Sequence, residues 1–167
     1  MILYVMRHGP AEDHAPTGKD FDRRLTESGR AVVARAAELL RASRSEPLRR
    51  ILSSPLVRAR ETAEIVRRGA ARPEVVVEVD ERLSSSADIP SALAYQLARG
   101  AEDALLVGHN PNIDALAREL GRGAAATLRG FRTAMIVAFE ADEDSNPAGP
   151  RVDNPSLRLV SVVDPHA

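Results

Sequence analysis

Four side chains that could handle a phosphoryl group stand directly after, or soon after, short apolar runs of the chain. Arg7 and His8 follow the first run, Arg58 comes soon after a second, and His109 follows a third. An imidazole can attack phosphorus as a nucleophile, and a guanidinium offers several hydrogen-bond donors to phosphoryl oxygens. The residue types therefore indicate chemistry on a phosphoryl group, with His8 as the candidate nucleophile.

The apolar runs predict the elements that position these side chains. Residues 2–7, 50–53 and 104–108 are short and rich in strand-forming residues, which is typical of buried parallel strands. In open α/β sheets, ligands bind just beyond the carboxyl ends of such strands. Gly9 lets the chain turn away sharply after His8. We therefore expect the three strand ends to bring their side chains together.

The surroundings of Arg58 also indicate an anion. Ser54 and Pro55 are expected to open a helix over about 55–69, because proline suits the first turn and a preceding serine can cap it. Arg58 then lies near the positive end of that helix, where a cation is ordinarily unfavourable. An arginine in this place is reasonable if an anion is to be held there.

The alternation of strand and helix patterns predicts a three-layer α/β/α sandwich with a mostly parallel sheet. Thr26 can cap the first helix, and Gly121 is expected to end the last. Two strands at the end of the chain have no helix between them, so we expect an antiparallel pair at the edge of the sheet. The predicted helices span about 27–42, 55–69, 89–99 and 111–120, and the predicted strands about 2–7, 50–53, 75–79, 104–108, 133–140 and 157–163.

Composition sets further bounds. A chain of 167 residues is expected to form one domain over 1–167. Its net charge of −1 argues against a nucleic-acid-binding protein, and the absence of cysteine excludes cysteine-based phosphatase chemistry. No run of apolar residues is long enough to span a membrane, and the first residues do not resemble a secretion signal. We expect a cytoplasmic monomer.

The motifs together resemble those of the histidine phosphatase superfamily, also called phosphoglycerate-mutase-like, and most of all its SixA-type phosphohistidine phosphatases. Residues 7–9 match the family's Arg-His-Gly, residues 54–62 match Ser-Pro-x-x-Arg-Ala-x-x-Thr, and residues 108–111 match Gly-His-x-Pro. The small branch also carries Arg-Pro-Leu-Thr, which here reads Arg-Arg-Leu-Thr over 23–26, with Arg24 in place of the proline. The motifs lie in the family's order and cover nearly the whole chain.

The resemblance implies a reaction in two steps, through a phosphohistidine intermediate that water hydrolyses. Hydrogen-bond donors around the phosphoryl group stabilise its equatorial oxygens, so we expect neither a metal nor another cofactor. The implied catalytic residues are His8, Arg7, Arg58 and His109, and the implied substrate-binding residues are Arg23 and Gly9. Arg24 could take the place of Arg23 as a phosphate ligand.

The leaving group distinguishes the substrate classes. An alcohol leaves poorly unless a general acid protonates it. Larger family members supply a glutamate after the third strand, within a longer region than residues 80–88 of this chain. Glu81 and Asp88 are the candidate general acids here, and neither lies in the family's usual context. A phosphorylated imidazole can depart as neutral imidazole, so a weak or missing acid favours a phosphohistidine substrate.

We therefore expect a metal-independent phosphatase acting on phosphohistidine in a protein partner, either a phosphorelay domain or a phosphocarrier of sugar uptake. A small-molecule phosphomonoesterase is the alternative among enzymes. A non-catalytic phosphohistidine-binding protein is the alternative in another class, and the pair His8 and His109 argues against it.

Overall fold

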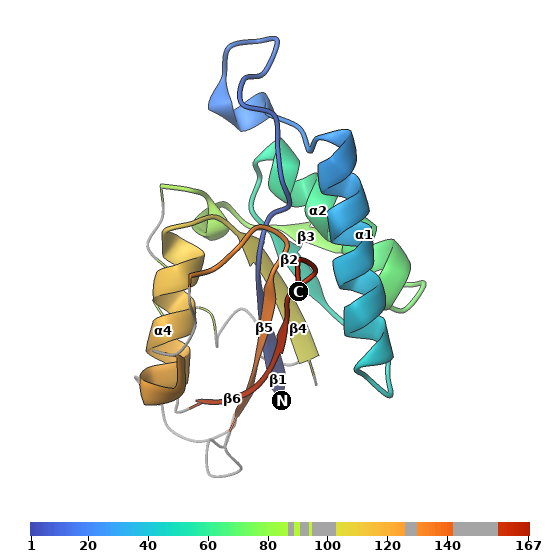
Figure 1. Cartoon of the computed structure of the whole chain (residues 1–167), viewed down its shortest axis with the longest axis vertical. Coiled ribbons are helices and arrows are strands. Elements are labelled where there is room, and N and C mark those ends of the chain that lie inside the picture. The colour runs from blue at the N-terminus through green and yellow to red at the C-terminus, as the bar shows by residue number, and fades with distance from the viewer. Residues whose placement is uncertain (87–88, 91–93, 95–102, 126–129, 142–156) are drawn as a thin grey trace.

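The computed structural model describes residues 1–86, 89–90, 94, 103–125, 130–141 and 157–167. Within them the chain alternates strands with helices and ends in two strands (Figure 1). The strands are β1 Ile2–Arg7, β2 Ile51–Ser53, β3 Val77–Val79, β4 Asp103–Gly108, β5 Ile136–Ala141 and β6 Leu157–Val163. The helices are α1 Glu27–Ala42, α2 Val57–Ala70 and α4 Asn112–Ala125, with 3-10 turns η1 Asp20–Asp22 and η2 Glu81–Leu83.

All the described strands join one sheet in the order β3-β2-β4-β1-β5-β6. The first four in this order run parallel to one another. The two final strands pair antiparallel at the edge, as the sequence predicts. The strand that is antiparallel to these four is β5. It lies between β1, with which it pairs, and the edge strand β6. Because β6 reverses again, the outermost strand points the same way as β1.

Each face of the sheet carries its own apolar core. On one face, Tyr4 and Met6 of β1 pack with buried side chains of α1 and α2. On the other face, Leu3 and Val5 pack with buried side chains of α4. Figure 1 shows α1 and α2 covering one face and α4 the other. The prediction of a three-layer α/β/α sandwich is therefore confirmed.

Two helix boundaries differ from prediction. Thr26 caps α1 as expected, with its Oγ1 accepting a hydrogen bond from the Gly29 amide at 2.9 Å. In contrast, α2 begins at Val57 rather than at residue 55, and Leu56 rather than serine occupies the cap position. The prediction that Gly121 ends the last helix is also wrong, because α4 continues to Ala125. A glycine costs a helix only about 1 kcal/mol, which a helix can tolerate before its end.

The strand predicted over 133–140 begins later, at Ile136. A turn precedes it, in which the Met135 amide donates to the Arg132 carbonyl at 3.2 Å. Within this turn Ala134 has a φ of 61°, and its amide donates to the carbonyls of Arg7 and His8. The turn therefore ties the start of β5 to the end of β1, where the candidate nucleophile lies.

The helix predicted over 89–99 and the loop predicted between the last two strands lie for the most part outside the described residues. Asp88, one of the two candidate general acids, lies outside them as well. Among the helices that the structure describes, none is long and apolar enough to cross a membrane.

Candidate active site

The carboxyl ends of three parallel strands, β1, β2 and β4, lie together at one end of the sheet, as the apolar runs predict. Arg7 ends β1 and pairs with Gly108 at the end of β4. The His8 amide donates to the Gly108 carbonyl at 3.1 Å, and the Ser54 amide after β2 donates to the Val107 carbonyl at 3.0 Å. The loop that follows β1 projects beyond these ends (Figure 1). Side chains that follow the three strands therefore share one place.

His8 lies in this place with a defined tautomer. Its Nδ1 lies 2.8 Å from the Gly9 carbonyl oxygen, which can only accept, so Nδ1 carries the proton. Its Nε2 accepts a hydrogen bond from Arg58 Nε at 3.3 Å. The ring is buried. The lone pair on Nε2 is therefore held on the side of the ring where Arg58 lies.

The same surroundings keep the imidazole neutral. Burial, together with the positive charges of Arg58, Arg7 and Arg23, lowers the pKa of His8 to about 4. The hydrogen bond to Gly9 acts in the opposite direction. A histidine with this pKa carries an available lone pair at neutral pH, which a nucleophile requires.

His109 lies beside His8, with 4.9 Å between the ring centroids. Its Nε2 forms a hydrogen bond with Ser54 Oγ at 2.8 Å, whereas its Nδ1 is buried without a partner among the described residues. Burial, followed by the charges of His8 and Arg58, lowers the pKa of His109 to about 3. A buried polar atom without a partner costs free energy, and a ligand oxygen here would relieve that cost.

Arg58 connects the nucleophile to the loop above it. It lies in the first turn of α2 and is buried. While its Nε donates to His8, its Nη1 donates to the Asp20 carbonyl oxygen at 2.8 Å and its Nη2 to Asp20 Oδ2 at 3.0 Å. The guanidinium therefore spans the distance between the imidazole and a carboxylate.

Two further arginines complete the positive surroundings. Arg7 donates through Nη1 to the Phe131 carbonyl at 3.0 Å, and its buried Nε lacks a partner in the described part of the chain. Arg23 donates through Nη1 to Asp20 Oδ1 at 2.8 Å. The structure thus brings Arg23 to the group around Arg58, whereas Arg24 is exposed and lines a separate hollow of about 500 Å³.

Comparison with known proteins assigns this arrangement to a family. A sequence profile of the histidine phosphatase superfamily (branch 1) matches residues 3–86. An uncharacterized protein of Picosynechococcus sp. is 32% identical over 144 residues, which cover 84% of this chain and 86% of that protein. The chain belongs to the histidine phosphatase superfamily.

Solved structures place this histidine phosphatase in the SixA-type branch. The protein histidine phosphatase SixA in complex with tungstate is 28% identical, with 99% of this chain and 98% of that chain covered and a TM-score of 0.80. A protein from Agrobacterium tumefaciens, described as a candidate phosphohistidine phosphatase SixA, is 26% identical, with coverage of 98% and 96% and a TM-score of 0.75. A mycobacterial glucosyl-3-phosphoglycerate phosphatase shares the fold at 22% identity, coverage of 95% and 96% and a TM-score of 0.62. These likenesses support a phosphatase activity and leave its substrate open.

Gly9 has a packing role in this histidine phosphatase. A Cβ at this position would lie 2.4 Å from Val33 Cγ2, so α1 leaves room only for glycine. The Gly9 amide donates to Thr62 Oγ1 at 3.0 Å, and the Thr62 hydroxyl donates to the Arg58 carbonyl at 2.7 Å. The Gly9 amide is therefore engaged within the fold, and the contact of Gly9 with substrate stays a prediction.

The structure does not connect Glu81 to the histidines. Glu81 begins η2 and is exposed. Among the described residues, its side chain forms no hydrogen bond or ion pair with His8, His109 or Arg58. Of the two candidate general acids, the one that the structure describes is thus not part of the cluster around His8.

Three polar residues of the site have roles that sequence analysis did not assign. Ser54 was expected only as a helix cap, yet its Oγ contacts His109 as well as accepting from the Leu56 amide at 3.3 Å. Thr62 belongs to a recognised motif, but its link between α2 and Gly9 requires the fold. Asp20 stands three residues before Arg23 in a polar loop, and no motif distinguishes it from the other acids there.

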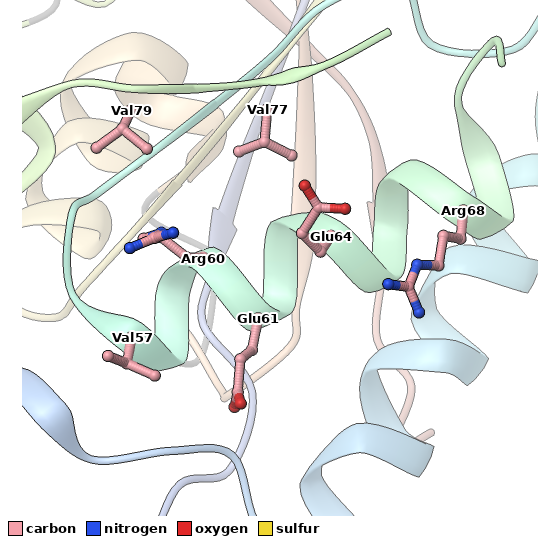
Figure 2. Close-up of a pocket in the computed structure, with 7 residues that line it drawn as sticks. All are labelled: Val57, Arg60, Glu61, Glu64, Arg68, Val77 and Val79. Carbon is pink, nitrogen blue, oxygen red and sulfur yellow. The ribbon is translucent and has the colours of Figure 1, made fainter. Parts of the chain in front are cut away.

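A separate hollow of about 390 Å³ lies along the exposed side of α2, against β3 (Figure 2). Val57, the residue before Arg58 in the sequence, lines both this hollow and the hollow beside Arg24. The lining residues are Val57, Arg60, Glu61, Glu64, Arg68, Val77 and Val79. Neither histidine of the site is among them, so the hollow is separate from the cluster around His8.

Proposed function

We propose that this histidine phosphatase hydrolyses phosphohistidine in a protein partner, with His8 as the nucleophile. The observation that carries the proposal is the neutral His8 imidazole, whose Nε2 lone pair lies next to the buried Arg58 guanidinium. In the first step a bond forms between Nε2 and phosphorus while the bond from phosphorus to the leaving group breaks. Water then attacks phosphorus, which releases orthophosphate and restores His8.

Charge on the transferred group is stabilised by the donors around His8. The three equatorial oxygens accept hydrogen bonds from Arg58, Arg7 and His109. Such preorganised donors lower the barrier most where water is excluded. Two buried atoms that lack partners among the described residues, Arg7 Nε and His109 Nδ1, are suited to these contacts. The SixA relative binds tungstate, an oxyanion, which agrees with an oxyanion site here.

The leaving group favours phosphohistidine over an alkyl phosphate. An alkoxide requires a proton from a general acid, and Glu81 has no hydrogen bond to the cluster in the described part of the chain. A phosphorylated imidazole with a proton on its remote nitrogen departs as a neutral molecule without this help. Val57 lines two hollows, one along α2 and β3 and one beside Arg24, and these offer concave surface for a protein partner.

A parallel kinetic screen tests the proposal. The kcat/KM values for a phosphohistidine phosphocarrier, a phosphohistidine phosphorelay domain and a set of sugar and glycerol phosphates should be measured with the same preparation. We expect the highest values for the phosphohistidine proteins and no loss of rate with a chelator. Higher values for an alkyl ester would assign a small-molecule phosphomonoesterase instead. Binding of phosphohistidine without turnover would assign the non-catalytic alternative.

A further inference from the structure

Asp20 uses both of its carboxylate oxygens to bind the arginines of the proposed site. Its Oδ1 accepts from Arg23 Nη1 at 2.8 Å, and its Oδ2 accepts from Arg58 Nη2 at 3.0 Å. Its main-chain oxygen accepts from Arg58 Nη1 at 2.8 Å. Both terminal nitrogens of the Arg58 guanidinium are therefore occupied by a single residue of the same chain.

The two partners in this ion pair differ in how firmly they are held. The Arg58 side chain is only 6% exposed, whereas the Asp20 side chain is 58% exposed. Asp20 begins the three-residue turn η1, which has no side-chain cap and no buried residue. This turn lies in the loop between β1 and α1 that projects from the molecule (Figure 1). The arginine is thus anchored in the fold, while the carboxylate can move away at little cost in burial.

A carboxylate and a phosphoryl group compete for the same donors. Both present oxygens with negative charge at a spacing that suits the two parallel N–H bonds of a guanidinium. Asp20 also acts on His109, since its negative charge raises the pKa of that histidine. A dianion held by Arg58 and Arg23 beside this carboxylate would meet like charge at short range, so both anions cannot keep the same donors.

We propose that Asp20 is an internal anion, which holds the arginines in position in the empty site and which the phosphoryl group displaces. The inference rests on the proposed function, because it assumes that Arg58 receives phosphoryl oxygens. It gives Asp20 a part in specificity. Weakly held anions, orthophosphate above all, must compete with the carboxylate, whereas a substrate that makes further contacts displaces it. The returning carboxylate also favours release of the product.

Binding of orthophosphate and vanadate by calorimetry tests this role directly. The test compares the wild-type protein with Asp20→Asn, which keeps an acceptor oxygen but removes the charge. Asp22→Asn is the matched control, because Asp22 lies in the same turn and bonds to Thr17 rather than to an arginine. We expect Asp20→Asn to bind orthophosphate about fivefold more tightly, as removal of a half-exposed competing ion pair allows. Asp22→Asn should bind like the wild type.

Kinetics and spectroscopy supply readouts that a merely structural role would not move. In Asp20→Asn the KM and the inhibition constant of orthophosphate should fall by a similar factor, with a smaller change in kcat. In the wild-type protein, saturating orthophosphate should shift the amide NMR signals of residues 19–23. Equal or weaker phosphate binding by Asp20→Asn, or unmoved loop signals in the phosphate-bound wild type, would overturn the inference alone. Absence of oxyanion binding in every variant would overturn the proposed function with it.

Discussion

The two ends of the parallel sheet each contain a buried arginine, and they use it differently. At the amino end, Arg44 forms an ion pair with Asp103, the first residue of β4, and their side chains are 9% and 8% exposed. The Arg49 amide donates to the other carboxylate oxygen at 2.8 Å, and the Tyr4 hydroxyl also bonds to Arg44. This carboxylate is fixed in a strand and enclosed by its partners.

At the carboxyl end, the counterion of Arg58 is a carboxylate on an exposed turn. Two buried nitrogen atoms at this end, Arg7 Nε and His109 Nδ1, lack hydrogen-bond partners among the described residues. The arginine–aspartate pair at the amino end is therefore enclosed by the fold, whereas the pair at the carboxyl end can separate, because its carboxylate is exposed. The difference lies in where the carboxylate is held, and it indicates which arginine is structural and which is available to a ligand.

The largest effect, a loss of stability, is expected from breaking the ion pair between Arg44 and Asp103. Asp103→Asn leaves Arg44 buried without its counterion, which typically costs 3–5 kcal/mol of stability. Urea unfolding should show this loss, while kcat per folded molecule stays close to that of the wild type. The double variant Arg44→Met with Asp103→Leu is the control, because removing both charges should restore much of the stability. A loss of activity in folded Asp103→Asn would show that this end is not purely structural.

Loss of Arg58 should lower the rate of the reaction instead of the stability of the fold. Arg58→Ala removes a donor aimed at the transferred oxygens, and loss of one such donor typically lowers the rate on the order of 100- to 1,000-fold. Steady-state kinetics measures the effect, with thermal unfolding to verify the fold. Arg60→Ala, an exposed arginine two residues further along α2, should be nearly neutral. If Arg58→Ala lowers the rate less than about threefold while folded, the arginine is not part of the catalytic machinery.

The two histidines at the carboxyl end of the sheet, His8 and His109, should make the free energy of unfolding depend on pH. The folded pKa values of about 4 for His8 and about 3 for His109 lie below the value near 6.5 of an unfolded histidine. As pH falls below 6.5 the unfolded chain takes up protons first, so stability is complete above that pH and decreases below it. Between pH 7 and 5 each histidine should cost about 2 kcal/mol in the free energy of unfolding.

Urea unfolding at several pH values measures this slope above the range where carboxylates titrate. His109→Gln should remove about half of it. A wild-type protein whose stability is constant between pH 7 and 5 would mean that the two histidines are not buried as neutral groups.

The smallest effect is expected at Glu81, which stands apart from the cluster around His8. Glu81→Gln should leave hydrolysis of a phosphohistidine protein unchanged within about twofold, because neutral imidazole needs no acid. An aryl phosphate with a good leaving group serves as the control for general damage. A large loss confined to alkyl phosphates would make Glu81 a general acid and would favour the phosphomonoesterase.

Sequence analysis predicted the parts of the fold that depend on local pattern. Apolar runs located β1, β2 and β4, and the spacing of buried residues with a Thr26 cap located α1. The predicted boundaries were wrong where contacts between residues distant in the sequence determine them. The start of β5 is set by a turn that bonds to the end of β1, which local residue types do not reveal.

The same distinction applies to the site. Motifs predicted His8, Arg7, Arg58 and His109, and the structure brings these four together. That Arg23 rather than Arg24 lies beside Asp20 and Arg58 is visible only in the fold, since adjacent arginines differ only in the direction that the loop gives them. Asp20 could not be found from the sequence, because its role depends on a contact with Arg58 across 38 positions of the chain.

The central claim is that His8 carries the phosphoryl group, and rapid quenching tests it most directly. The protein should be mixed with a radiolabelled phosphohistidine protein, quenched in base within a fraction of the turnover time, and digested for mass spectrometry. We expect an acid-labile, base-stable adduct at residue 8, present in His14→Ala and absent, along with activity, in His8→Ala. An adduct on another residue, or an active His8→Ala protein, would contradict it.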